Sequence, residues 1–352
     1  MTKGLTISTV AQMAGVSKTT VSRYLNGKYE FMSPQTRQRI QDVILKTGYQ
    51  PNHLAQSLKS RRSMLAGLLV ADIESPFSAA AVKAIGDVIG QAGYTLITVD
   101  TGGDPKRQQE ALDSLVQRQV DGIIVNSAAE ETQQLGRIQH SGIPVVLLDR
   151  FVGERGFDIG YLENERPIQA LLSHLREQEY GRIALFVQDY AAASPRYLRW
   201  KAFLDATARQ GGGVGEAQVY VVDPQRQETL DSALCRLMVL SRGDPKPPAV
   251  IAANGVTLMH TVKSIRSFDI RMPWDIGLCG YDDWGWMTQL GLAGLVDVGL
   301  TAVSPSVHEL GEKTARLLLE RMAGYTGEPR EICIEAPLVV RRSTLRKEEA
   351  NR

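Results

Sequence analysis

Lys18, Thr19 and Arg23 form a polar, basic group on a short predicted helix near the N-terminus. Ser17, directly before them, is a favourable N-cap, because its hydroxyl can accept a bond from a backbone N–H that the first helical turn leaves unmade. A helix that presents lysine, threonine and arginine side chains carries the donors that hydrogen-bond base edges in the DNA major groove. The chemistry indicated by these residue types is therefore recognition of a nucleic acid.

A second short helix and a tight turn are needed to position this group. Val10 and Ala14 give the preceding segment a small apolar face, and Val21 and Leu25 lie four residues apart on one face of the polar helix. Gly15 stands between the two segments and tolerates the positive φ that a tight turn requires. The spacing predicts two helices that pack through these apolar faces and leave the basic face outward.

The run Ala14-Gly-Val-Ser-Lys-Thr-Thr-Val-Ser-Arg23 resembles the helix-turn-helix of the LacI/GalR family of transcription regulators. The resemblance implies that Lys18, Thr19 and Arg23 read base edges. It assigns phosphate contacts to Ser17, Thr20 and Asn26. The alternative is a generic helical hairpin with the same turn, which the rest of the chain disfavours.

Positive charge is concentrated at the N-terminus. Residues 1–62 hold ten lysines and arginines against two acidic residues, a surplus of eight, although the whole chain of 352 residues has a formal net charge of only +1. A basic head on a mildly acidic body favours polyanion binding by the head. Charge alone leaves open a merely solvated basic face.

A third helix and a connector follow. Ser33-Pro34 is a helix start and Gly48 a helix stop, so we expect an all-α headpiece over residues 1–50. Residues 51–63 then form either a plain linker or a hinge helix, and the helix is too short to be stable alone. The family resemblance favours a hinge helix that folds on the operator and inserts a leucine into the minor groove. The residues assigned to it are Asn52, Ala55 and Leu58.

Residues 64–352 alternate apolar runs with amphipathic segments, which is typical of a parallel sheet covered by helices on both faces. The predicted strands are Leu65–Ala71, Tyr94–Val99, Val120–Asn126, Ile143–Asp149, Gly181–Gln188, Ala217–Val222, Ala249–Ala253 and Ile276–Gly280. The predicted helices are Ala79–Ala92, Lys106–Gln117, Glu130–His140, Arg166–Gln178, Arg196–Gln210, Gln225–Val239, Val256–Ser267 and Ser306–Met322, and Glu331–Leu345 is expected to be extended. We expect two similar α/β lobes separated by a cleft. Motifs such as Glu74-Ser-Pro-Phe77, Ala252-Ala-Asn254 and Gly280-Tyr-Asp-Asp283 resemble the periplasmic-binding-protein-like, dimerising cores of the LacI/GalR family.

Polar residues at the carboxyl ends of the predicted strands define a candidate site for a small effector, because ligands of open α/β lobes bind there. The strand-end candidates are Ser75, Phe77, Asp149, Arg150, Asn254 and Asp282, and Asp223 is expected on the hinge side of the cleft. The resemblance adds Arg199, in the run Arg199-Trp-Lys-Ala-Phe203, as an effector-contacting arginine. Asp149 and Asn254 could instead be helix caps. The chemistry fits a sugar; Arg150, Arg196 and Arg199 suit a sugar acid of the gluconate or ketogluconate type, and a neutral sugar with Arg150 in an internal ion pair is the alternative.

Other classes of protein are disfavoured. Cys235, Cys279 and Cys333 have no metal or disulfide spacing and are expected as small core residues, and the five histidines have no metal spacing either. We see no secretory signal, no membrane-spanning run and no common catalytic or nucleotide-binding motif, so we expect a cytoplasmic protein with no enzyme activity, cofactor or metal.

The sequence thus predicts a repressor that binds a near-palindromic double-stranded operator as a homodimer and responds to a sugar or sugar-acid effector. A dimer is favoured over a tetramer because no leucine heptad follows Thr344. The alternative is a sugar-binding protein without a DNA role, which the basic headpiece and the absent signal disfavour.

Overall fold

The computed structural model describes residues 5–49, 62–126, 133–153, 156–208, 218–283 and 299–346. The chain divides into two compact units, residues 1–64 and residues 65–352. We call the first unit the headpiece and the second unit the core.

The headpiece is a bundle of three helices. Its elements are α1 (Ile7–Ala14), α2 (Lys18–Leu25), the 3₁₀ turn η1 (Tyr29–Phe31) and α3 (Pro34–Thr47). The hydroxyl groups of Ser17 and Ser33 accept bonds from the third backbone N–H beyond them, so both predicted N-caps are confirmed. Gly15 has a φ of 65° at the turn, as the sequence requires. Val10 and Val21 are fully buried where α1 meets α2, which leaves the polar face of α2 in solvent.

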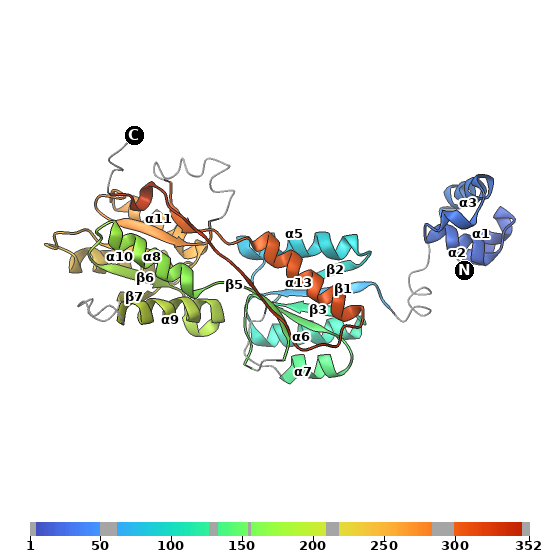
Figure 1. The fold of residues 1–352 in the computed structure, drawn as a ribbon, viewed down its shortest axis with the longest axis horizontal. Coiled ribbons are helices and arrows are strands. Elements are labelled where there is room, and N and C mark those ends of the chain that lie inside the picture. Colours follow the sequence, from blue (N-terminus) through green and yellow to red (C-terminus); the bar gives the residue numbers. More distant parts are fainter. Residues whose placement is uncertain are drawn as a thin grey trace. The chain divides into compact units, whose positions relative to one another are not determined.

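The core contains two lobes, each built on a six-stranded sheet (Figure 1). The sheet of the first lobe has the order β11-β5-β4-β3-β1-β2, and all its strands are parallel. Its strands are β1 (Leu65–Val70), β2 (Thr95–Asp100), β3 (Gly122–Val125), β4 (Val145–Leu148), β5 (Asp158–Leu162) and β11 (Glu331–Ile334). Its helices are α5 (Pro76–Gln91), α6 (Pro105–Gln117), α7 (Gln133–His140) and α13 (Val307–Met322).

The sheet of the second lobe has the order β12-β10-β9-β8-β6-β7, in which only the terminal strand β12 is antiparallel to its neighbour. Its strands are β6 (Ile183–Val187), β7 (Gln218–Val221), β8 (Ala249–Ala252), β9 (Gly277–Tyr281), β10 (Thr301–Val303) and β12 (Leu338–Val339). Its helical elements are α8 (Glu165–Glu177), η2 (Tyr190–Ala192), α9 (Ser194–Ala208), α10 (Gln227–Leu240), α11 (Gly255–Ser267) and η4 (Arg342–Thr344).

Helices cover both faces of each sheet, as the apolar strands predict. Leu68 and Val70 pack on the α5 and α13 side of the first sheet, whereas Leu69 packs on the α6 side. In the second lobe, Leu185 packs on the α8 and α9 side and Phe186 packs on the α10 and α11 side. The strict alternation of these side chains fixes the register, because a one-residue slip would reverse every face.

Three of the sequence predictions for the core need correction. The helix Ser306–Met322 was expected with the second series of elements, but α13 packs on α5 and on the first sheet. Gly311 allows this contact, since a Cβ there would lie 2.7 Å from the Cβ of Ala84 on α5. The segment Glu331–Leu345 is extended in β11 and β12, as predicted, but these strands join different sheets and the segment ends in the 3₁₀ turn η4. The strands β5 and β10 were not predicted: β5 opens with a charged residue and contains a glycine, and β10 has three residues.

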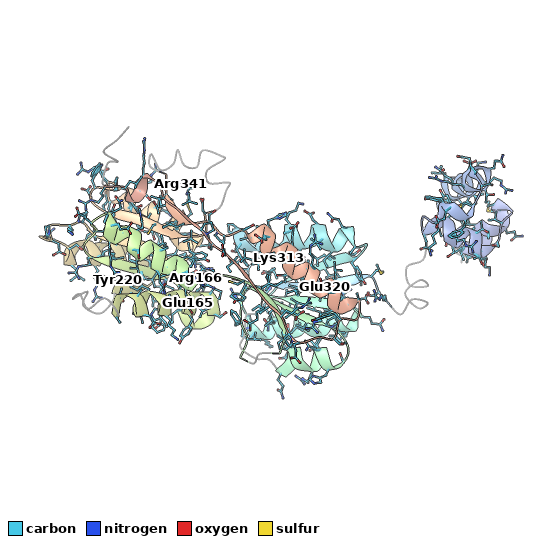
Figure 2. All side chains as sticks on the ribbon, in the orientation of Figure 1. Glu165, Arg166, Tyr220, Lys313, Glu320 and Arg341 are labelled. Carbon is cyan, nitrogen blue, oxygen red and sulfur yellow. The ribbon has the colours of Figure 1, made fainter. Side chains whose placement is uncertain are left out.

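The chain crosses between the lobes three times within the described residues. The first crossing, residues 162–164, joins β5 to α8, and Glu165 and Arg166 stand at the start of α8 directly after it (Figure 2). The second crossing joins β10 to α13, and the third joins β11 to β12. The backbone N–H of Glu163 donates to the carbonyl of Ile334 at 2.9 Å, and that of Ser304 donates to the carbonyl of Pro337 at 2.8 Å. The third crossing is therefore hydrogen-bonded to each of the other two.

Candidate functional site

The exposed face of α2 carries the residues predicted to read DNA. Lys18, Thr19 and Arg23 are all exposed, while Val21 on the same helix is buried in the headpiece. The guanidinium of Arg23 lies 5.2 Å from the centre of the Phe31 ring, which belongs to η1 and is 60% exposed. Phe31 was not predicted as a site residue, because an aromatic residue after the helix gives no periodic signal. The arrangement places a basic, donor-rich surface beside one aromatic ring.

The residues assigned to phosphate contacts have local hydrogen bonds. The Oγ of Ser17 caps α2 and lies 2.9 Å from the Oγ1 of Thr20. The Nδ2 of Asn26 donates to the carbonyl of Ser22 at 2.7 Å, at the end of α2. These bonds fix the two ends of the helix. The proposed hinge residues Asn52, Ala55 and Leu58 lie outside the described residues.

A cavity of about 190 Å³ lies in the core, where strands of both sheets end. Each strand of a parallel sheet contributes its carboxyl end to the same edge, so polar residues that follow different strands converge there. Seven of the eight predicted effector residues line this cavity: Ser75, Phe77, Asp149, Arg150, Arg199, Asn254 and Asp282. Both lobes therefore contribute to its wall.

Asp223 is the predicted residue that does not line the cavity. Its carboxylate accepts a bond from the backbone N–H of Gln225 at 3.0 Å, which closes the turn before α10. Its neighbours Pro224 and Gln225 line the cavity in its place. The sequence indicated the correct loop but the wrong side chain, because the direction of a loop residue depends on turn geometry.

Asp149 and Asp282 hold corresponding positions in the two lobes. Each directly follows a strand of its sheet, and each is buried in the left-handed backbone region, with φ values of 62° and 74°. Within the described residues, Asp149 is not the N-cap of a helix. The Oδ1 of Asp149 accepts from the N–H of Leu162 at 3.3 Å, and the Oδ2 of Asp282 accepts from the N–H of Gly255 at 3.0 Å. Non-glycine residues in this conformation concentrate at ligand sites, where other contacts hold them.

Arg199 lies between these two carboxylates and is itself buried. Its Nε donates to the Oδ1 of Asn164 at 2.8 Å, and its Nη1 donates to the carbonyl of Ala253 at 2.7 Å. The guanidinium carbon lies 3.4 Å from the centre of the Tyr281 ring. Arg199 is thus anchored on three sides, and within the described residues its Nη2 makes no hydrogen bond that would compete with a ligand.

The electrostatics of the cavity combine buried acids with crowded cations. Burial raises the pKa of Asp149 and of Asp282, and the charge of Arg199 opposes this rise. Burial, together with the positive charges of Arg150 and Arg199, lowers the pKa of Arg196 to about 10. Burial also lowers the pKa of Arg150, against the pull of Asp149 and Asp72. A ligand that brought negative charge to Arg150 and Arg196 would relieve this repulsion.

Three further cavity residues were not assigned to the site from the sequence. Asn126 is buried and its Nδ2 donates to the carbonyl of Leu148 at 2.8 Å. Gln188 accepts at its Oε1 a 2.7 Å bond from the Nδ2 of Asn254, which also caps α11 through its Oδ1. Asn126 and Gln188 end predicted strands, so the strand-end rule would have found both. Arg196, considered only as a source of charge, also lines the cavity.

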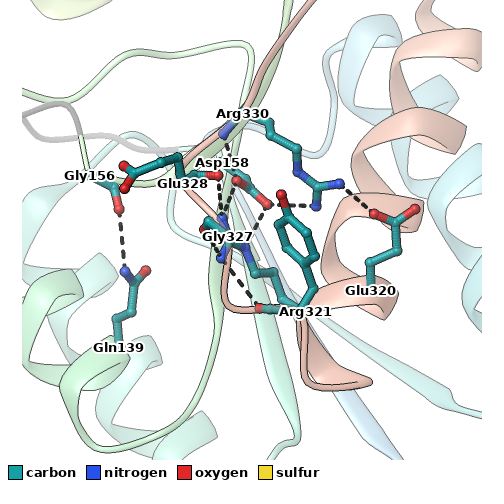
Figure 3. A network of polar contacts seen from close by, with 9 residues as sticks. Gln139, Gly156, Asp158, Glu320, Arg321, Gly327, Glu328 and Arg330 are labelled. Atoms are coloured by element: carbon teal, nitrogen blue, oxygen red, sulfur yellow. Dashed lines mark hydrogen bonds and ion pairs between the residues drawn. The ribbon is translucent and has the colours of Figure 1, made fainter.

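A second cavity, of about 480 Å³, lies at the opposite edge of the first sheet. Beside it, Arg321 and Arg330 both donate to the fully buried carboxylate of Asp158 (Figure 3). Arg321 also donates to the carbonyls of Gly327 and Glu328. Burial alone would raise the pKa of Asp158, but its bonds to the two arginines outweigh burial and lower it. The two arginines neutralise Asp158, and the network anchors the start of β11.

The structure also places the three cysteines. Cys279 is buried, but Cys235 and Cys333 are exposed, so the prediction of a core position was wrong for these two. Cys235 lies on the outer side of α10, and Cys333 lies in the strand β11 at the margin of its sheet. Among the described residues, no helix is both long and apolar enough to cross a membrane.

The headpiece and the core together define a class of protein: a helix-turn-helix reader joined to a two-lobed core with a polar cavity. Comparison with known proteins identifies that class. Residues 6–52 match the family of bacterial regulatory proteins called the lacI family, and residues 172–344 match the periplasmic binding protein-like domain.

Full-length relatives agree with these matches. The chain is 31% identical to the transcriptional regulator KdgR of Bacillus subtilis, over 96% of this chain and 97% of the relative. It is 32% identical to the transcriptional regulator PtxS of Pseudomonas putida, over 97% of this chain and 96% of the relative. The chain belongs to the lacI family and is a DNA-binding transcription regulator.

Solved structures show the same fold. A lac repressor dimer bound to operator and an anti-inducer is similar with a TM-score of 0.79 and 22% identity, over 97% of this chain and all of that one. A complex of the regulator CelR with cellobiose has a TM-score of 0.67 and 24% identity, over 96% of this chain and 99% of that one. The predicted fold class, an α-helical headpiece with a two-lobed α/β core, is confirmed.

Proposed function

We propose that this regulator is a repressor whose affinity for its operator is set by a small effector bound in the cavity of the core. The observation that carries the proposal is the buried cluster of Asp149, Arg199 and Asp282, which draws on both lobes and lines a cavity of about 190 Å³. A ligand that bridges such a cluster binds one arrangement of the lobes more tightly than another. Its binding energy then shifts the equilibrium between arrangements, and with it the affinity for DNA.

The DNA-binding end follows the family pattern. Lys18, Thr19 and Arg23 are proposed to contact bases in the major groove, which their exposure on α2 supports. Ser17, Thr20 and Asn26 are proposed to contact phosphates. In the hinge segment Asn52, Ala55 and Leu58 are proposed to enter the minor groove, with Leu58 as an apolar wedge. We accordingly propose that residues 1–50 form the DNA-binding headpiece, residues 51–63 the hinge helix and linker, and residues 64–352 the effector-binding core. We also propose that the protein is cytoplasmic.

The effector is proposed to be a sugar acid. Hydroxyl groups of such a ligand suit the carboxylates of Asp149 and Asp282 and the amide of Asn254, while Phe77 offers an apolar face. Burial, reinforced by the positive charges of Arg150 and Arg199, lowers the pKa of Arg196 to about 10, and this crowded cation favours an anionic ligand over a neutral sugar. The complex of CelR with cellobiose is an example of a similar protein with a bound sugar.

A homodimer is proposed as the state that binds a near-palindromic operator, because a twofold protein matches a twofold site. The exposed apolar side chains of the second lobe support it. Val221 on the edge strand β7 is 58% exposed, and Val239 and Leu240 on α10 are 64% and 46% exposed. Edge strands and exposed aliphatic side chains are both features that association covers.

The test uses Arg199→Ala and the exposed, charge-matched control Lys201→Ala on the same helix. Operator affinity is measured by fluorescence anisotropy with and without D-gluconate, with D-glucose as the neutral comparison. The wild-type protein and Lys201→Ala should change operator affinity with the acid, while Arg199→Ala should bind operator but no longer respond. An unchanged response in Arg199→Ala would remove the cavity from the mechanism.

A sugar-binding protein without a DNA role is the alternative considered from the sequence. The lacI-family match over residues 6–52 and the full-length regulators among the relatives count against it. The same operator measurement decides it, because such a protein would bind the sugar acid and fail to bind any palindromic DNA specifically.

A further inference from the structure

The first crossing between the lobes is hydrogen-bonded to the effector cavity at three consecutive residues. The N–H of Leu162 donates to the Oδ1 of Asp149, and the Oδ1 of Asn164 accepts from the Nε of Arg199 at 2.8 Å. Between them, the carbonyl of Glu163 accepts from the hydroxyl of Tyr281. Asp149 and Arg199 line the cavity, and Tyr281 lies directly under the guanidinium of Arg199.

Asn164 is built into this position. It is 3% exposed, and its Nδ2 donates to the carbonyl of Leu162 at 2.7 Å. The amide therefore uses its oxygen for Arg199 and its nitrogen for the crossing backbone. A change in the direction of the Arg199 guanidinium cannot leave Asn164 unaffected, because the donor and acceptor of a buried bond move together or lose the bond.

Tyr281 makes a parallel connection. Its ring is fully buried with the guanidinium carbon of Arg199 3.4 Å from its centre, and its hydroxyl reaches across to Glu163. Glu163 in turn donates its N–H to Ile334, in the third crossing. The contacts of Arg199 thus extend to two of the three segments that set the angle between the lobes.

We infer that Asn164 and Tyr281 are positioning residues. When an effector binds Arg199, they transmit the change to the segments that cross between the two lobes, so that the ligand acts directly on these crossings. This inference rests on the proposed function. Neither residue is needed to hold the ligand, since neither lines the cavity. Removing them should uncouple ligand binding from DNA binding, whereas removing a ligand contact weakens ligand binding itself.

The experiment compares Asn164→Ala and Tyr281→Phe with the control Glu165→Gln, an exposed residue directly after the same crossing. Calorimetry gives the affinity for D-gluconate, and anisotropy gives operator affinity without ligand and at ligand saturation. We expect both variants to bind D-gluconate and, without ligand, to keep operator affinity within about threefold of wild type. The ratio of operator affinities without ligand and at ligand saturation should be smaller than in the wild type by about tenfold or more. Glu165→Gln should respond as the wild type does.

Two results would overturn the inference. If both variants responded to saturating ligand as the wild type does, these residues would not transmit ligand binding to the crossing. If a loss of D-gluconate affinity fully explained the weaker response, Asn164 and Tyr281 would only shape the ligand site and would not couple it to DNA binding. If Asn164→Ala does not fold, Tyr281→Phe decides alone, because it removes one hydroxyl and keeps the ring. A wild-type protein with no response to D-gluconate is a different result, which rejects the proposed effector and the inference with it.

Discussion

At the scale of single residues, burial changes what an arginine can do. Arg199 is predicted to contact the effector, but its Nε and Nη1 already donate to Asn164 and Ala253. Arg196 keeps more of its capacity, since the one hydrogen bond described for it joins its Nη1 to the carbonyl of Asp189 at 3.3 Å. The residue that distinguishes an acid from a neutral sugar is therefore better sought at Arg196.

Arg196→Gln should weaken binding of D-gluconate more than binding of D-glucose. A hydrogen bond to a charged group contributes about 1.5–3 kcal/mol, so the preference for the acid should fall by about tenfold or more. Titration calorimetry with both sugars measures the preference, and Lys201→Gln, an exposed residue one turn further along α9, is the control. Equal losses for the two sugars would mean that Arg196 shapes the cavity without selecting for charge.

Arg23→Ala tests the reading face of α2. Loss of a base contact should cost about 1–3 kcal/mol of discrimination between the operator and a variant site, while binding to unrelated DNA survives. Lys46→Ala removes a positive charge from the same headpiece at the end of α3 and should leave base preference intact. Anisotropy titrations over a range of salt separate the two effects, and an equal loss on all sequences in Arg23→Ala would make it a phosphate contact.

At the scale of elements, short segments near the C-terminus tie the second lobe together. The 3₁₀ turn η4 is held by a chain of buried bonds in which the Nε2 of His174 lies 2.7 Å from the Oγ1 of Thr344, and that hydroxyl lies 2.6 Å from the Oγ1 of Thr301. Burial lowers the pKa of His174 below its ordinary value of 6.5, against the opposing charge of Glu177. The folded protein therefore favours the neutral imidazole.

This arrangement predicts a stability that depends on pH. The unfolded chain binds a proton at His174 more readily than the folded chain, so the free energy of unfolding should fall as pH drops from 7.5 through 6.5 toward the lowered pKa. His174→Gln removes that titration and should flatten the dependence. Urea unfolding at pH 7.5 and 5.5 measures it, with His308→Gln on the exposed face of α13 as the control. A slope unchanged in His174→Gln would contradict the assignment.

At the scale of the whole molecule, the edge of the second sheet is the feature that a single chain leaves incomplete. Val239→Glu places a charge beside the exposed Leu240 at the end of α10, so it should shift the protein from dimer to monomer and weaken operator binding without loss of fold. Sedimentation velocity measures the shift. Trp274→Glu, also exposed but in the loop after α11, is the control; a Val239→Glu protein that remains dimeric would place the interface elsewhere.

Some features follow from local sequence alone. The caps at Ser17 and Ser33, the turn at Gly15 and the alternation of strands and helices depend on residues within one turn or one strand of each other. The rule that ligands bind beyond strand ends found six of the cavity residues for the same reason, since position along a strand fixes the edge at which it ends, whereas Arg199 came from the family resemblance.

Other features depended on partners far along the chain, and only the tertiary structure decided them. Asp158 can open a buried strand because Arg321 and Arg330, more than 160 residues later, neutralise it. Crossings between the lobes place α13 in the first lobe and divide the C-terminal segment between two sheets. The periodicity of apolar residues does not predict these crossings. The sequence by itself determined that this protein has a DNA-reading helix and a polar cavity at strand ends. The tertiary structure decided that Arg199 is bonded to the first crossing through Asn164, because a buried guanidinium takes whichever acceptors the fold brings within reach.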